Sequence, residues 1–315
     1  MHLILKVLRR LYAAAAGGGG SLRNWQFVSV KEYANGLIHD MLTSDKPCMV
    51  ARFGATEMLC LTNFLGVSAR KKDYAGFIKG RAFPWWWEKR TLDQIQRWSG
   101  IFPPTPQMAG RFSKLMIEDM AQVDLLGSWL WDESRFTREL KGAKRVMLED
   151  IEPFFCNNPW TRALEGKKVL VVHPFAETIE GQYARREKIF PDGLLPKFEL
   201  KTIKAVQSIA GEPTPFGDWF EALEYMKAEI DRTDYDVCII GCGAYGFPLA
   251  AHVKRSGHKA IHLAGVTQLL FGIIGARWED YLIFPYMNLF NEHWVRPGGS
   301  ERPANAGRVE GACYW

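Results

Sequence analysis

The 315-residue chain lacks the short motifs that mark several common enzyme classes. It has no G-x-x-x-x-G-K-[ST] phosphate loop, no H-E-x-x-H zinc motif, no paired cysteine–histidine zinc spacing and no G-x-S-x-G nucleophile elbow. Its six cysteines form no C-x-x-C pair, and two of them lie in an apolar segment. This usage favours a reduced, cytosolic setting over a disulfide framework.

The sequence also has neither a strong charge imbalance nor a long uninterrupted apolar run. Its 40 basic and 35 acidic residues give a mild net charge of +5 that is spread along the chain, so we expect no nucleic-acid partner. Polar residues and three glycines break the longest apolar stretch, residues 260–276. That stretch therefore predicts a buried strand and helix rather than a membrane span.

The N-terminus has the pattern of a short amphipathic helix. Residues 1–12 place apolar and basic side chains on opposite helical faces, the first being Ile4, Val7, Leu8, Leu11 and Tyr12 and the second Lys6, Arg9 and Arg10. We expect either peripheral contact with anionic lipid, or a helix that packs against the chain's own domain or is a frayed end. Residues 13–21 are predicted to be a flexible connector, and residues 22–315 a single domain.

Strand and helix patterns alternate along most of the remaining chain. Short apolar runs predict strands at residues 48–51, 145–148, 168–172, 198–205, 236–240 and 259–264. Helical patterns occur at residues 29–43, after an N-cap at Thr56, at residues 178–188, and from the cap Asp218 to residue 230. The alternation predicts an α/β fold with a doubly wound, mainly parallel, Rossmann-like sheet. Residues 70–142, which include three consecutive tryptophans, are expected to form a helical insertion, and residues 294–315 an irregular tail.

The most informative local pattern is a glycine loop that follows the strand at residues 236–240. Gly241, Gly243 and Gly246 are spaced so that the backbone can turn tightly and present helix N-terminal amides, which suits a phosphate or diphosphate. The alternative is a packing turn with no ligand. An NAD or FAD site would also need an acid at the end of the next strand. That position holds His262 and apolar neighbours, which weakens a dinucleotide interpretation.

Ligands of open α/β sheets bind beyond the carboxyl ends of the strands, so polar residues that follow strands are candidate site residues. Arg52 is suited to a phosphate and Glu57 to a base or metal ligand, the alternative being an ion pair between them. His173 is either catalytic or a core histidine bonded to the backbone. Tyr245 either contacts a ligand or packs in the core. Gln268, among apolar neighbours, needs a partner that is either substrate or backbone.

Several of these segments together resemble bacterial glycosyltransferases of the GT-D type and GT-D-like domain proteins. The segment at residues 52–57, Arg-Phe-Gly-Ala-Thr-Glu, is similar to the R-F-G-D-G-E signature of that family. The other matching segments are Val172-His-Pro-Phe175, Thr214-Pro-Phe with Asp218-Trp219, the loop at residues 241–246, residues 265–272 with Arg277-Trp278, and Glu310-Gly-Ala-Cys-Tyr-Trp315. The resemblance covers a little over half of the chain and implies a GT-D-like fold that binds a nucleotide-sugar donor.

The chain departs from the family pattern at the metal-binding pair. GT-D enzymes use a D-x-E pair to hold a divalent cation, whereas here Ala55 replaces the first acid and Glu57 alone remains. Two expectations stay open: Mg²⁺ or Mn²⁺ held by Glu57 and substrate phosphates, or a metal-independent reaction in which Arg52 neutralises the diphosphate.

The resulting hypothesis is a cytoplasmic glycosyltransferase that transfers a sugar to a glycan or lipid-linked acceptor in surface polysaccharide or glycoconjugate assembly. Glu57 and His173 are the predicted catalytic residues. The predicted donor-binding residues are Arg52, Gly54, Gly241, Gly243, Tyr245, Gly246 and Gln268. A non-catalytic nucleotide-sugar-binding scaffold or sensor, and an NAD-linked oxidoreductase, are the alternatives.

Overall fold

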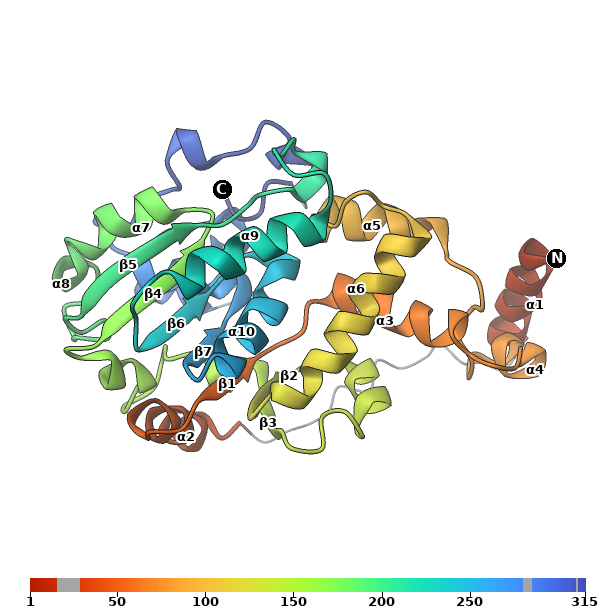
Figure 1. Ribbon diagram of the computed structural model, residues 1–315, viewed down its shortest axis with the longest axis horizontal. Helices are drawn as coiled ribbons and strands as arrows, with labels where there is room; N and C mark the ends of the chain where they lie inside the picture. Colours follow the sequence, from red (N-terminus) through yellow and green to blue (C-terminus); the bar gives the residue numbers. More distant parts are fainter. Residues whose placement is uncertain (16–28, 280–284, 310) are drawn as a thin grey trace.

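The protein is built on a seven-stranded, all-parallel sheet. The computed structural model describes residues 1–15, 29–279, 285–309 and 311–315 (Figure 1). The strands lie in the order β3-β2-β1-β7-β6-β4-β5. Their bounds are β1 (Cys48–Ala51), β2 (Leu125–Ser128), β3 (Lys144–Met147), β4 (Lys168–His173), β5 (Glu199–Lys204), β6 (Val237–Ile240) and β7 (Lys259–His262). The predicted parallel α/β sheet is confirmed.

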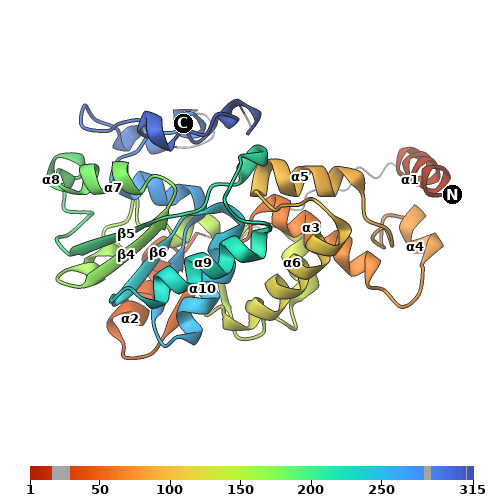
Figure 2. The ribbon, with the colours of Figure 1, turned by 45° about the horizontal axis from the view of Figure 1, so that its top comes forward.

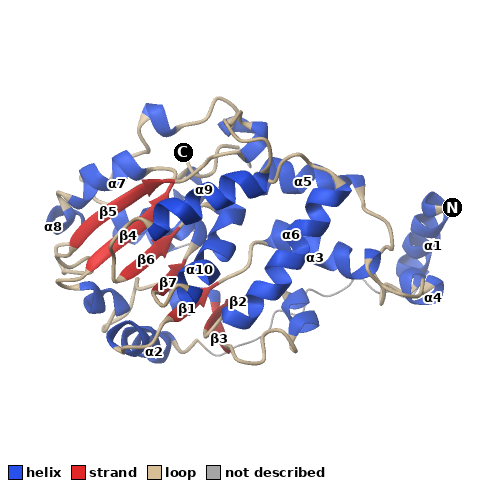
Figure 3. Ribbon diagram, in the orientation of Figure 1, coloured by secondary structure: helices blue, strands red, loops and turns tan. Residues whose placement is uncertain are grey.

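Helices cover both faces of this sheet because successive strand residues point to opposite sides. In β1, Met49 and Ala51 belong to one core cluster, and Cys48 and Val50 to the other. The first face is covered by α3 (Ala55–Val67), α6 (Pro106–Asp119), α9 (Trp219–Asp231) and α10 (Gly246–Arg255). The second is covered by α2 (Lys31–Thr43), α7 (Ala176–Tyr183), α8 (Arg186–Ile189) and the segment after β7 (Figure 3). The fold is therefore doubly wound and Rossmann-like.

The predicted helical insertion at residues 70–142 needs a correction. It contains α4 (Tyr74–Ile78), α5 (Lys89–Ser99) and α6, as expected, but it also contains strand β2. All four residues of β2 are buried, and β2 pairs with β1 and β3. Four apolar or small residues are too few to show a strand period, so the sequence could not separate this strand from its helical surroundings.

The predicted N-cap of one helix and the continuity of another also differ from the structure. The helix after β1 begins at Ala55 with Gly54 at its N-cap, so Thr56 is not the cap. The helix expected over residues 178–188 is divided into α7 and α8. At the start of α9 the expected cap is confirmed, since Asp218 accepts hydrogen bonds from the N–H groups of Phe220 and Glu221 at 2.8 and 2.9 Å.

The two ends of the chain lie at different places on the molecule. Helix α1 (His2–Ala15) lies beside α4 at the end remote from the sheet (Figures 1 and 2). Residues 16–21 of the predicted connector lie outside the described residues, whereas residues 13–15 continue α1. The C-terminal segment passes over the sheet (Figure 2), and its terminal Trp315 is buried. Among the described helices, none combines the length and apolar character that a bilayer span requires.

Candidate functional site

A cavity of about 220 Å³ lies at the carboxyl ends of the strands. Five strands supply lining residues at or directly after their last position, namely Arg52 (β1), Trp129 (β2), His173 (β4), Gly241 (β6) and His262 (β7). The strand order explains this convergence. Strand β1 is central in the sheet, with β2 on one side and β7 followed by β6 on the other. This reversal of strand order is where open α/β sheets bind ligands.

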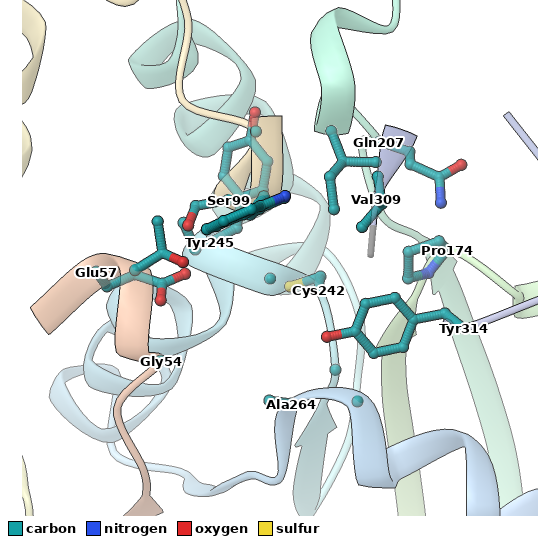
Figure 4. Close-up of a pocket in the computed structure, with 18 of the residues that line it drawn as sticks. Gly54, Glu57, Ser99, Pro174, Gln207, Cys242, Tyr245, Ala264, Val309 and Tyr314 are labelled. Carbon is teal, nitrogen blue, oxygen red and sulfur yellow. The ribbon is translucent and has the colours of Figure 1, made fainter. Parts of the chain in front are cut away.

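Arg52 and the glycine loop lie in the same cavity. Figure 4 shows Gly54 and Glu57 on one side of it, Pro174 and Tyr314 on the other, and Cys242 of the loop between them. Segments almost 200 residues apart in the sequence therefore form one site. The C-terminal segment contributes to it as well, through Val309, Tyr314 and Trp315.

The charged side chains among the described residues of the lining are Arg52, Arg277 and Glu57. Arg277 already donates to the Tyr314 hydroxyl at 3.1 Å and to Sγ of Cys313 at 3.3 Å. Arg52 makes no hydrogen bond or ion pair with the described part of the chain; its guanidinium carbon lies 5.1 Å from the ring centroid of Trp129. Burial lowers the pKa of Arg52, while attraction to Glu57 opposes this effect. A partly desolvated cation of this kind is stabilised by an anion.

The glycine loop adds backbone donors to the cavity. Gly243 has φ of +56°, a left-handed conformation that glycine adopts readily. The Gly241 N–H bonds to the Val172 carbonyl at 3.0 Å, but those of Cys242, Gly243 and Ala244 find no acceptor in the described parts of the chain. All three residues line the cavity. Consecutive free amides before a helix form a concave donor surface that suits phosphate oxygens.

The third glycine of the loop has a different role. Gly246 opens α10 outside the cavity lining, and a Cβ atom there would lie 2.2 Å from Cε1 of His262. The imidazole of His262 thus occupies the space that a side chain at residue 246 would fill. Its Nδ1 lies 3.2 Å from the Ile240 carbonyl oxygen. Gly246 permits close helix–strand packing, which matches the packing alternative at this one position.

Gly54 and Glu57 form a compact unit at the start of α3. A Cβ atom at residue 54 would lie 1.7 Å from Oε2 of Glu57, so the carboxylate folds back over the glycine. The first helical turn favours a negative charge. Burial nevertheless raises the pKa of Glu57, and the charge of Arg52 acts in the opposite direction. A carboxylate with a raised pKa is better suited to accept a proton near neutral pH.

Among the described residues of the lining, Glu57 is the one side-chain carboxylate that could bind a divalent cation. Ala55 offers no side-chain ligand atom, and the described residues contain no cluster of three or more His, Cys, Asp or Glu side chains suited to a metal. Mg²⁺ or Mn²⁺ at this site would therefore be held by Glu57 together with oxygens of a bound substrate. Mg²⁺ commonly binds to one or two carboxylates and substrate phosphates in this manner.

His173 is held in a defined tautomer. Its Nδ1 accepts a hydrogen bond from the Phe175 N–H at 3.0 Å. Burial lowers the pKa of the ring to about 3, so the imidazole is neutral. The remaining proton is then on Nε2, which makes His173 a hydrogen-bond donor toward the cavity rather than a general base.

Tyr245 and Gln268 line the cavity but already have protein partners. The ring of Tyr245 stacks on Trp219 with centroids 4.8 Å apart, and its hydroxyl lies 3.0 Å from Oγ of Ser208. Gln268 donates to the carbonyls of Ile273 and Tyr314 at 3.2 and 3.3 Å. The observed contacts of Tyr245 are therefore those of a core residue, and those of Gln268 are hydrogen bonds to the backbone.

Several residues of the site were not predicted from the sequence, Trp129 and Arg277 among them. Trp129 was not recognised because its strand, β2, was hidden in the predicted helical segment. Arg277 was noted without a role, and it lies at the cavity because the C-terminal segment packs there: its Nη1 bonds to the Tyr314 hydroxyl at 3.1 Å. In contrast, the tryptophans at residues 85–87 are not among the residues that line the cavity.

Comparisons with protein-family models, with curated proteins and with solved structures gave no match to this chain. The resemblance of its motifs to GT-D enzymes therefore stays a prediction. Because one fold hosts many functions, the doubly wound sheet alone does not assign an activity. The chemistry of the cavity is the remaining basis for a function.

Proposed function

We propose that this chain is a glycosyltransferase that takes a sugar from a nucleotide-sugar donor. The observation that carries the proposal is the convergence of Arg52 and the loop amides of residues 242–244 on one cavity. This is a site for an anion with several oxygens. The diphosphate of a nucleotide sugar fits this set of hydrogen-bond donors better than NAD or FAD.

The two kinds of hydrogen-bond donor, the guanidinium group and the backbone amides, have complementary roles. A guanidinium group can bind two phosphate oxygens at once, and backbone amides bind oxygens in a fixed direction. When the sugar leaves, negative charge develops on the diphosphate. Hydrogen-bond donors that are already positioned stabilise this charge without reorganisation, which lowers the barrier to sugar transfer.

The two predicted catalytic residues take different parts in this scheme. Glu57, whose pKa is raised by burial, orients the donor or accepts the proton of the acceptor hydroxyl. His173 donates a hydrogen bond from Nε2 to a ligand oxygen, since its Nδ1 is already an acceptor. A bound Mg²⁺ or Mn²⁺ would supply further neutralisation of the diphosphate. The motif resemblance supports a glycan or lipid-linked acceptor at a cytoplasmic site.

A panel of nucleotide sugars, with and without Mg²⁺ or Mn²⁺, tests this function. We expect at least one donor to bind and to be slowly hydrolysed, and Arg52→Ala to weaken binding by about 10- to 100-fold through loss of charge-assisted hydrogen bonds. Arg185→Ala is the matched control, because Arg185 is exposed between α7 and α8. If no nucleotide sugar binds, the proposal is wrong.

A second candidate function is a non-catalytic nucleotide-sugar-binding scaffold. The presence of Ala55 in place of an acid and the single side-chain carboxylate in the described lining favour it. This alternative predicts donor binding without turnover under any metal condition. It also predicts that Glu57→Gln leaves donor affinity within about twofold, whereas the enzyme hypothesis predicts a loss of hydrolysis.

A further inference from the structure

Helix α1 packs on its neighbours through its polar side chains. The ring of His2 stacks on Trp86 with centroids 3.9 Å apart. Lys6 pairs with Glu88 at 3.0 Å, and the guanidinium carbon of Arg9 lies 4.9 Å from the ring centroid of Phe77. Lys6 and Arg9 of the basic face are therefore turned toward the rest of the protein, whereas Arg10 is exposed.

The apolar face of α1 is turned outward as a result. Leu3 is 75% exposed, Ile4 64% and Leu11 61%, and Val7 and Leu8 are also exposed. Leu5 is the α1 side chain that is buried. A helix that packed on its own domain to form a core would show the reverse orientation. An exposed apolar row of this kind marks an interaction surface.

The surroundings of α1 are strongly basic. We call residues 1–12 and 68–90 together the basic lobe. It contains ten Lys and Arg residues and two acidic residues, which leaves 30 basic and 33 acidic residues in the rest of the chain. The exposed basic residues next to α4 are Arg70, Lys71, Lys72, Lys79 and Arg81. The positive net charge of the protein thus comes from this lobe.

We propose that the basic lobe docks on the surface of an anionic lipid bilayer, with the exposed face of α1 inserted at the interface. Apolar residues beside clustered Lys and Arg bind such surfaces through apolar burial and attraction to anionic headgroups. A second copy of the chain is a poorer partner for the same surface, because two basic lobes would repel each other. The proposal does not depend on the function assigned to the cavity.

Two helices connect the basic lobe with the cavity. Helix α3 begins at the cavity lining and ends at Val67, next to the lobe, while α5 begins in the lobe at Lys89 and ends at Ser99 in the lining. With 13 residues, α3 is about 20 Å long. Docking of the basic lobe would therefore hold the cavity about 20 Å above the lipid surface.

Co-sedimentation of the full chain with vesicles tests the proposal. Phosphatidylcholine vesicles with and without phosphatidylglycerol are compared for the wild type, Leu8→Asp, and the triple variant Arg70→Glu, Lys71→Glu, Lys72→Glu. The matched controls are Tyr225→Asp, at an exposed aromatic residue of α9, and the triple variant Arg185→Glu, Lys188→Glu, Lys197→Glu, at exposed residues outside the basic lobe. Circular dichroism of every variant checks that it is folded.

We expect the wild type and both controls to bind anionic vesicles and not neutral ones. Each variant of the basic lobe should lose more than about tenfold in affinity. The proposal is overturned if the wild type does not bind, if it binds neutral vesicles equally well, or if the lobe variants bind like the controls. It is also overturned if Leu8→Asp dissociates a dimer in solution without changing vesicle binding.

Discussion

The guanidinium group of Arg52 stacks over the indole ring of Trp129, with 5.1 Å between the guanidinium carbon and the ring centroid. The indole is fixed in turn, since its Nε1 donates to the carbonyl of Phe53 at 2.8 Å. Stacking rather than an ion pair thus positions Arg52. Its planar set of N–H donors is left available to a ligand in the cavity.

This arrangement predicts that arginine cannot be replaced by lysine. Arg52→Lys keeps the charge but loses the planar donor fork and the stacking on Trp129. We expect an affinity for the bound nucleotide about tenfold weaker than that of the wild type. Isothermal titration calorimetry measures the change, with Arg185→Lys as control. Equal affinities of Arg52→Lys and wild type would contradict a bidentate role.

The contact between Gly54 and Glu57 predicts the effect of a single methyl group. Gly54→Ala would place Cβ where Oε2 of Glu57 now lies, so the carboxylate must move. Because the end of the Glu57 side chain can rotate away, we expect the variant to fold with a stability within about 1 kcal/mol of wild type. Its donor hydrolysis should fall as far as that of Glu57→Ala. Hydrolysis assays and thermal melts of both variants compare the two effects, and wild-type activity in Gly54→Ala would refute the coupling.

Much of the scaffold could be predicted from the sequence because buried parallel strands appear as short apolar runs. The strands on either side of the glycine loop, β6 and β7, and the strand before Arg52 were predicted in this way. Strand β2 was not, since its four residues include Gly127 and Ser128 and lie between helical patterns. Consequently Trp129 was not recognised as a site residue.

The side-chain roles were harder to predict because they depend on distant partners. Nothing local to Tyr245 shows that Trp219 stacks on it, or that the backbone of Tyr314 satisfies Gln268. The tautomer of His173 likewise depends on the backbone turn to Phe175. Residue type and position after a strand identify candidates, whereas tertiary contacts decide what each can do.

The packing of His262 against Gly246 predicts a large effect on stability. A Cβ atom at residue 246 would lie 2.2 Å from Cε1 and 2.4 Å from Nδ1 of the ring. We expect Gly246→Ala to destabilise the fold by about 1–3 kcal/mol, measured by urea unfolding. Gly181→Ala in α7 is the control, since a Cβ there meets nothing within 4 Å. The double variant Gly246→Ala, His262→Ala should cost less than the sum of its single changes; full additivity would show that the contact is unimportant.

The buried histidines predict a pH dependence of stability. Burial lowers the pKa of His173 and of His262 to about 3, whereas an unfolded histidine has a pKa of about 6.5. Below pH 6.5 the unfolded chain therefore binds protons that the native chain does not, so stability falls with decreasing pH and is regained above this value. Each site should contribute up to about 1.4 kcal/mol per pH unit between pH 6 and 5. His173→Asn, whose Oδ1 can replace Nδ1 as acceptor, should reduce this slope in urea titrations; an unchanged slope would contradict the assignment.

A crystal structure of the chain with a nucleotide sugar would show whether Arg52 and the glycine loop bind one diphosphate. We expect diphosphate oxygens within hydrogen-bond distance of the Arg52 guanidinium and of the N–H groups of residues 242–244. A nucleotide bound elsewhere on the protein, or a diphosphate in contact with neither group, would contradict this expectation.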